Sequence, residues 1–345
     1  MKIKKSIIVV LIMMGLVMCA FSIAQSKVSI NVTEDQYVLP VAELASTKTN
    51  PEIIHMSNDL VAIDLIPNRG RILSNFMLSD QQQSYLYQKF VPDPMVLPGG
   101  LHTVEFGGYY FSLPWNTRDR QPFDLQFEIL NSTEDLGEIF LSGKDMFQKT
   151  LTEVWVRMKK ASPVIEIETK ITNTSKKTPK DLEFRDFTVF YIHDNENSNE
   201  QIILPVDKIK IIESKNDWAG SKESLFEWPE SFSQWKMIND YLVFQSASQL
   251  ISSLAGMYYP ETNDVFVKSW KPENFFNGAE VWSWGKNYVN EPGAAPYIIY
   301  SNISQFTLQP MESKSFMIYF TVMSDIAEQD ITLEALLNKV SQLLP

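Results

Sequence analysis

Apolar and polar residues alternate along most of the chain beyond about residue 50. Between residues 164 and 171, for example, Ile165, Ile167 and Ile171 fall on one face of an extended chain and polar residues fall on the other. A period of two is typical of strands with one buried face. Similar runs occur at 60–66, 151–158, 182–193, 241–245 and 315–323, with turn-forming residues between them. The pattern predicts an all-β protein built from antiparallel sheets packed as a sandwich.

Only the last segment has helical periodicity. Its apolar residues recur at steps of three and four, at Leu333, Leu336, Leu337, Val340 and Leu344. Asp330 or Thr332 precedes this segment and is suited to cap a helix. We therefore expect a short C-terminal helix that docks on the outside of a sheet. No internal repeat or long linker divides the chain, so we expect a single domain over residues 51–345, preceded by an N-terminal arm at 25–50.

The first 24 residues have the layout of a cleavable signal peptide. Three lysines precede an apolar run at 7–21, which ends in small residues before Gln25. The run is shorter than the ~20 residues of a spanning helix, so we expect no stable membrane span after cleavage. The predicted location is extracytoplasmic, either periplasmic or secreted. Lipoprotein anchoring at Cys19 is the alternative, and it is disfavoured because Met18 stands where a small residue is expected.

Composition and charge narrow the possible partners. The formal net charge is −12, which disfavours nucleic acids and anionic membrane surfaces because both are bound through lysine and arginine. Phosphate-binding loops and nucleophile elbows are missing from the sequence, and the three histidines His55, His102 and His193 are far apart along it. The acidic run at 194–200 lacks the glycine of an EF-hand and is interpreted as a solvated loop. We expect neither a metal nor a cofactor.

One aromatic segment suggests a binding surface. Glu280, Trp282 and Trp284 share a face at the strand period. The C–H face of a pyranose stacks on a flat indole while its hydroxyls need a few polar partners, so this face is suited to a sugar. Packing of the tryptophans in the core is the alternative.

Two further segments carry candidate polar groups. In 182–193, the alternation places Arg185 and His193 on one side of a strand, where the histidine is suited to act as a general acid or base. An ordinary surface or core histidine is the alternative. Around the paired glycines at 99–100, Glu105 and Asn116 are suited to bond sugar hydroxyls, although a plain turn also explains the glycines.

Short motifs recur in a fixed order along the chain. They are Asn68-Arg69-Gly70-Arg71-Ile72, Gly99-Gly100 with Val104-Glu105-Phe106 and Pro114, Leu204-Pro205-Val206-Asp207, Val281-Trp282-Ser283-Trp284-Gly285, and Ala295-Pro296-Tyr297-Ile298. The combination resembles the galactose mutarotase-like (aldose 1-epimerase-like) superfamily, and within it an uncharacterised bacterial branch. The resemblance extends over about residues 55–323. It implies an antiparallel β supersandwich with a sugar-binding groove across one concave sheet.

The resemblance also implies an acid–base pair, in which a histidine protonates the ring oxygen and a glutamate removes the anomeric hydroxyl proton. His193 corresponds best to that histidine, with His102 in reserve. Where the family has a glutamate after Pro-Tyr-Ile, this chain has Ile299, which leaves Glu280 and Glu105 as alternative bases. This departure favours binding over catalysis.

The sequence therefore predicts an extracytoplasmic protein that binds a mono- or oligosaccharide. The candidate ligand-binding residues are Arg71, Asn116, Arg185, Trp282 and Trp284, and the candidate catalytic residues are His193, Glu280 and Glu105. Two alternatives stay open: an active isomerase of the aldose 1-epimerase type, and a non-catalytic scaffold of the cell envelope that has lost the ligand.

Overall fold

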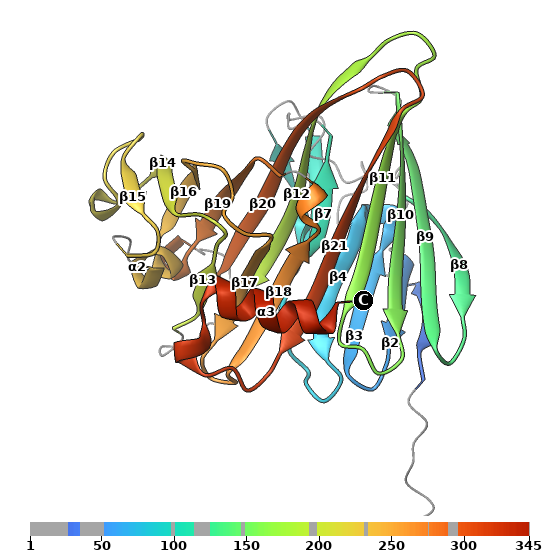
Figure 1. Ribbon diagram of the computed structural model, residues 1–345, viewed down its shortest axis with the longest axis horizontal. Helices are drawn as coiled ribbons and strands as arrows, with labels where there is room; N and C mark the ends of the chain where they lie inside the picture. The colour runs from blue at the N-terminus through green and yellow to red at the C-terminus, as the bar shows by residue number, and fades with distance from the viewer. Residues whose placement is uncertain are drawn as a thin grey trace, which may run out of the picture.

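Two large antiparallel sheets pack face to face in the computed structural model (Figure 1). The structure describes residues 27–34, 52–97, 101–113, 125–145, 149–192, 199–230, 234–274, 276–288 and 296–344. The described residues confirm the predicted all-β antiparallel sandwich. The predicted signal peptide, most of the N-terminal arm and Cys19 lie outside these ranges.

The larger sheet has eleven strands. Their spatial order is β1 (Ser29–Glu34), β2 (Glu52–Ser57), β3 (Val61–Ile66), β4 (Arg71–Leu78), β7 (Tyr109–Ser112), β12 (Lys180–Tyr191), β20 (Tyr297–Leu308), β19 (Gly278–Trp284), β16 (Tyr241–Ser246), β14 (Lys208–Ser214) and β15 (Leu225–Glu227). Strand β1 comes from the predicted N-terminal arm and pairs with β2 at one edge of the sheet.

The second sheet has eight strands. Their order is β13 (Gln201–Ile203), β17 (Leu254–Tyr259), β18 (Asp264–Trp270), β21 (Ser313–Met323), β11 (Ile165–Asn173), β10 (Thr150–Lys159), β9 (Leu136–Asp145) and β8 (Gln126–Ser132). A separate hairpin consists of β5 (Gln88–Leu97) and β6 (Leu101–Gly107). The predicted alternation holds in β11, where every second residue from Ile165 to Asn173 is buried.

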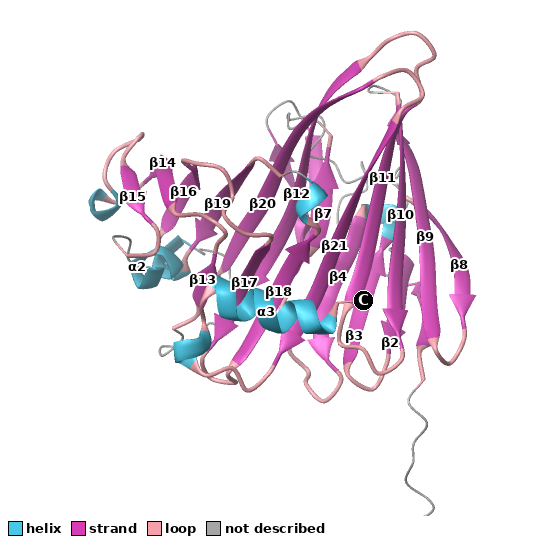
Figure 2. Ribbon diagram, viewed as in Figure 1, coloured by secondary structure: helices cyan, strands magenta, loops and turns pink. Residues whose placement is uncertain are grey.

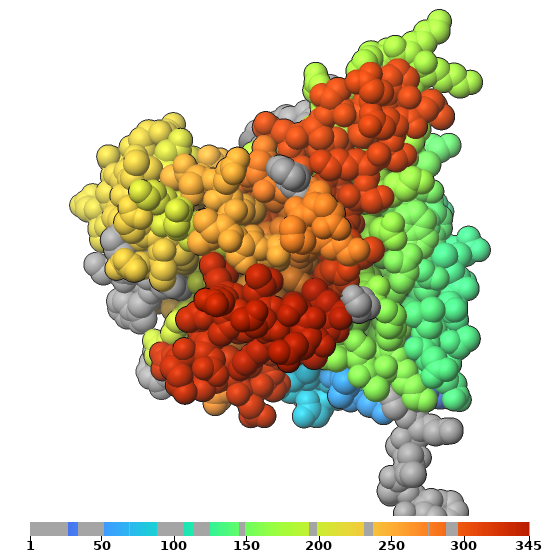
Figure 3. Space-filling view, viewed as in Figure 1, coloured from blue at the N-terminus to red at the C-terminus, as the bar shows by residue number. Residues whose placement is uncertain are grey.

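The predicted C-terminal helix is α3 (Leu333–Leu343), and it lies against the outside of the eight-stranded sheet (Figure 2). The hydroxyl of Thr332 accepts a hydrogen bond from the Ala335 amide, as expected of an N-cap. Leu336 and Val340 are fully buried in an apolar cluster with residues of β17 and β18. In space-filling view, the red C-terminal segment covers one part of this face and leaves the green strands beside it uncovered (Figure 3).

The expectation that only the last segment is helical was wrong in one place. A short helix, α2 (Gln234–Asn239), precedes β16, and a helix of six residues is too short to produce a detectable period. Among the described residues, the remaining helical elements are 3-10 turns: η2 (Pro67–Arg69), η3 (Asp217–Ala219), η4 (Pro272–Asn274), η5 (Lys286–Tyr288) and η6 (Glu328–Asp330).

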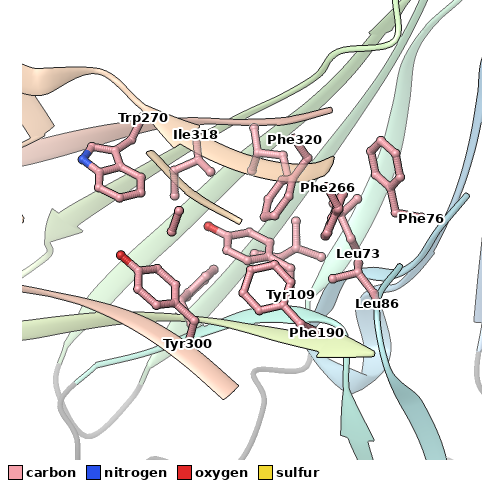
Figure 4. Packing of buried hydrophobic residues seen from close by; sticks show 14 of the residues in the cluster. Leu73, Phe76, Leu86, Tyr109, Phe190, Phe266, Trp270, Tyr300, Ile318 and Phe320 are labelled. Atoms are coloured by element: carbon pink, nitrogen blue, oxygen red, sulfur yellow. The ribbon is translucent and has the colours of Figure 1, made fainter. Parts of the chain in front are cut away.

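The main core lies between the two sheets and is rich in aromatic rings (Figure 4). Tyr109 of β7 packs edge-on against Phe320 of β21 at 4.9 Å between ring centroids. Phe184 of β12 stacks on Phe316 of β21 at 4.3 Å. Buried rings contribute large apolar areas and specific pair geometries, so these contacts both drive and orient the packing of one sheet on the other.

A buried ion pair also links the sheets. The Lys268 ammonium of β18 lies 2.7 Å from the Asp186 carboxylate of β12, and both side chains are 0% exposed. The distance is that of a close ion pair, although its angle departs from hydrogen-bond geometry. Burial lowers the pKa of Lys268 from its ordinary value, and the neighbouring Asp186 opposes that shift. Because a buried charge is tolerated only with a partner, each residue requires the other.

The outer face of the eleven-stranded sheet as a candidate site

The face of the eleven-stranded sheet turned away from the core, called here the outer face, carries the aromatic and charged residues noted in the sequence. On β12, Phe190 belongs to the main core, whereas Phe187 and Val189 belong to a separate apolar cluster. Arg185 and Tyr191 share their side of the strand. Asp186 points the other way, toward the eight-stranded sheet.

Four aromatic side chains form a line across the outer face, called here the aromatic row. Tyr191, Tyr297, Trp284 and Tyr241 are successive cross-strand neighbours on β12, β20, β19 and β16. The ring centroids of Trp284 and Tyr297 are 6.2 Å apart, and those of Trp284 and Tyr241 are 4.8 Å apart. All four side chains are half-buried, so each retains some exposed ring surface. Tyr87 supports the row by stacking on Tyr297 at 4.7 Å.

The next line of outer-face residues is apolar. It runs through Val189, Ile299, Trp282 and Val243 on the same four strands. Ile299 is 4% exposed and packs in the apolar cluster of the outer face. The resemblance places the glutamate of the family at Ile299, so this chain has a buried aliphatic side chain at that point of the sheet.

Beyond the apolar line lies a hydrogen-bonded set of five side chains, called here the polar network. Arg185 donates from Nη1 to Glu280 at 3.1 Å and from Nε to Glu183 at 2.7 Å. Gln245 donates to the second oxygen of Glu280. Gln305 donates to the second oxygen of Glu183 at 3.0 Å. The network therefore crosses β16, β19, β20 and β12, with Arg185 as the cation shared by two carboxylates.

The polar network restricts what its carboxylates can do. Both oxygens of Glu280 accept hydrogen bonds, and its side chain is 8% exposed. Burial tends to raise the pKa of Glu183, but hydrogen bonds from Gln305 and Arg185 outweigh burial and hold that pKa below its usual value. The network therefore favours the ionised form of Glu183, and it fixes the Glu280 carboxylate in place through a bond to each oxygen.

Arg71 lies on the same face, closer to the β1 edge. Its guanidinium is 4.3 Å from the ring centroid of Tyr110 on β7, and that ring stacks on Phe187 at 4.9 Å. Arg71 is 4% exposed. Its side chain thus packs against the aromatic residues of the outer face and presents little surface to a ligand.

A pocket of about 390 Å³ opens beside the polar network. Gln245 and Gln305 belong to its wall, together with Gly278, Ile303 and residues 246–249 at the end of β16 and in the loop after it. Its lining is dominated by amide and hydroxyl side chains.

The structure brings five of the predicted site residues to one face: Arg71, Arg185, Glu280, Trp282 and Trp284. His193 and Asn116 lie outside the described residues. Glu105 lies in β6, where the backbone alone is described at its position, and the same holds for His102. The acid–base pair implied by the resemblance therefore stays a prediction.

Sequence reasoning missed several residues that contribute to this face. Tyr297 stands in a quoted motif and Tyr241 begins an alternating run, but nothing local in the sequence shows that the two flank Trp284. Gln245 and Gln305 carried no signal of their own. All four become visible only once the pairing of β16, β19 and β20 is known.

Within the described ranges, no three or more histidine, cysteine, aspartate or glutamate side chains gather closely enough to hold a metal ion. Among the helices of the same ranges, none is both long and apolar enough to cross a bilayer.

Solved structures share this architecture at low sequence identity. A galactose mutarotase-related enzyme from Lactobacillus acidophilus is 12% identical with a TM-score of 0.50, and the match covers 80% of this chain and 99% of that one. A galactose mutarotase-like protein from Clostridium acetobutylicum is 11% identical with a TM-score of 0.50, and the match covers 86% and 99%. The fold is galactose mutarotase-like.

A TPR-domain-containing protein from Parabacteroides distasonis matches with a higher TM-score of 0.62 at 13% identity. The match covers 86% of this chain and 54% of that protein, so this chain spans about half of its length. No family model matches the sequence, and no curated protein does either. The galactose mutarotase-like fold is thus established by structure, at identities too low to transfer an activity.

Proposed function

We propose that the outer face of the eleven-stranded sheet binds a carbohydrate and that the protein acts as a carbohydrate-binding protein outside the cytoplasm. The observation that carries the proposal is the aromatic row, four half-buried rings from four neighbouring strands. The polar network lies on the same face, two cross-strand lines away. The galactose mutarotase-like fold supports the proposal, as does the signal-peptide layout of residues 1–24.

The chemistry of the face matches the two sides of a sugar. A pyranose presents C–H groups that pack on an aromatic ring, and hydroxyls that need directional hydrogen bonds. Trp284 and Tyr297 offer ring surface, and Gln245 and Gln305 offer amide groups farther along the same sheet. The outer face as a whole therefore offers both kinds of contact that a carbohydrate makes.

Binding without catalysis is favoured by two features of the site. A mutarotase needs a carboxylate that is free to remove a proton. Ile299 occupies the position where the resemblance places that carboxylate. Glu280 already accepts hydrogen bonds from Arg185 and Gln245. The isomerase alternative would depend on His193 and Glu105, whose side chains are not among those that the structure describes.

NMR exchange between the α and β anomers of a panel of reducing mono- and oligosaccharides tests the proposal. We expect broadened sugar resonances in the presence of protein and an unchanged exchange rate. Accelerated exchange for any sugar would contradict the non-catalytic proposal and establish an isomerase. Unbroadened resonances across the whole panel would contradict carbohydrate binding and favour the scaffold alternative.

A further inference from the structure

The pocket beside the polar network includes one outer-face position that lacks a side chain. Gly278 of β19 lies opposite Ile303 of β20 and belongs to the pocket wall. A Cβ added at Gly278 would lie 3.4 Å from Ser246 Oγ and 4.0 Å from Ile303 Cδ1. These are ordinary contact distances, so alanine fits this position. A longer side chain would continue into the pocket.

The polar network fixes which groups the pocket presents. The carboxylates of Glu280 and Glu183 accept hydrogen bonds only, so the amide nitrogens of Gln245 and Gln305 must face them. The carbonyl ends of both glutamines remain, and they accept hydrogen bonds from none of the described residues. The two carbonyl oxygens therefore lie in the pocket wall beside side chains that can also donate, such as Ser246 and Asn277. Such a lining suits neutral hydroxyls, which both donate and accept. The residues that line the pocket include no lysine or arginine, so a carboxylate, sulfate or phosphate substituent would have no cation to pair with in the wall.

The pocket and the aromatic row lie on the same three strands but far apart. Gly278 is six positions along β19 from Trp284, Ile303 is six positions along β20 from Tyr297, and Gln245 is four positions along β16 from Tyr241. At about 3.3 Å per residue, the separations are roughly 13–20 Å. Even the shortest of them exceeds the width of one pyranose ring, so a single sugar cannot contact both features.

We infer that the ligand is a neutral oligosaccharide several rings long, stacked at one end on the aromatic row and held at the other end in the pocket. The inference rests on the proposed function and specifies its substrate class. It assigns Gly278 as the residue that admits the distal ring and the two glutamine carbonyls as its acceptors.

Calorimetric titration with glucose oligosaccharides of two to six rings, in α1-4, β1-4 and β1-3 linkage, tests the inference. We expect the affinity of at least one series to rise about tenfold with chain length, the gain of one or two added hydrogen bonds. Gly278→Leu should abolish that gain. Gly278→Ala is the matched control and should retain the gain.

A second variant covers the case in which Gly278→Leu does not fold. Gln305 is exposed, so Gln305→Ala should fold and should reduce the gain, whereas the exposed Thr307→Ala outside the pocket should not. A gain that survives both pocket variants would overturn the inference. Tighter binding of oligogalacturonates than of the neutral series would also overturn it. Either result leaves the proposed function standing, whereas an absence of binding by every sugar, short or long, refutes the proposed function itself.

Discussion

Replacing Trp284 by alanine is expected to lower the affinity for carbohydrate by roughly 30-fold or more, since aromatic residues at the centre of a binding surface typically contribute at least about 2 kcal/mol. Trp284 is one of the two inner rings of the aromatic row and lies between Tyr297 and Tyr241. Its removal takes away the widest stacking surface and leaves a gap between the two tyrosines. Calorimetry with the best sugar from the NMR panel measures the effect.

Trp155 supplies the matched control. It is a half-buried tryptophan on β10 of the other sheet, and it packs on Phe140 at 5.1 Å between ring centroids. Trp155→Ala removes the same side chain from a comparable setting and should leave sugar affinity unchanged. Equal losses in the two variants would show that a general loss of stability is the cause, and an unaffected Trp284→Ala variant would remove the aromatic row from the site.

Lys268→Met is expected to lower the free energy of unfolding by about 3–5 kcal/mol, the typical cost of removing one partner of a buried ion pair. The methionine fills a similar volume, but the Asp186 carboxylate then remains 0% exposed without its cation. One of its oxygens keeps the backbone amide of Asn302, at 3.0 Å, which compensates only part of a full charge. Equilibrium unfolding in urea at neutral pH measures the loss.

The double variant Lys268→Met/Asp186→Asn separates charge from packing. Asparagine keeps the acceptor for the Asn302 amide and removes the charge, so the double variant should be more stable than Lys268→Met alone. Additive losses from the two substitutions would contradict a pairwise ion interaction and assign the cost to packing.

The strands could be predicted from the sequence because their period is local. Alternation in β11 marks its buried face without reference to any other part of the chain. The capping hydroxyl of Thr332 and the apolar stripe of α3 are local in the same way. The position of Glu280, Trp282 and Trp284 on one face of a strand also followed from the period alone.

The partners of those residues could not be predicted, because they depend on the pairing of distant strands. Glu280 meets Arg185 across 95 positions of sequence and Gln245 across 35. The same holds for the buried pair of Lys268 and Asp186, since no local pattern shows that two strands of opposite sheets place their charges together. Register between segments far apart in sequence is a property of the folded sheet and leaves no periodic signal.

Ile299 shows where motif and structure give complementary information. The resemblance indicated that a family carboxylate is missing, and the structure shows that the position is closed by apolar packing with Phe187 and Val189. A change to glutamate at this point would bury a charge among aliphatic and aromatic groups. The outer face therefore has an apolar side chain at the place where the resemblance puts the base of the family.

A crystal structure of the protein with the tightest-binding oligosaccharide tests the central claim most directly. The account predicts sugar density on the outer face of the eleven-stranded sheet, with one ring against Trp284 and Tyr297. Sugar bound elsewhere, such as on the outer face of the eight-stranded sheet around Trp155, would contradict it.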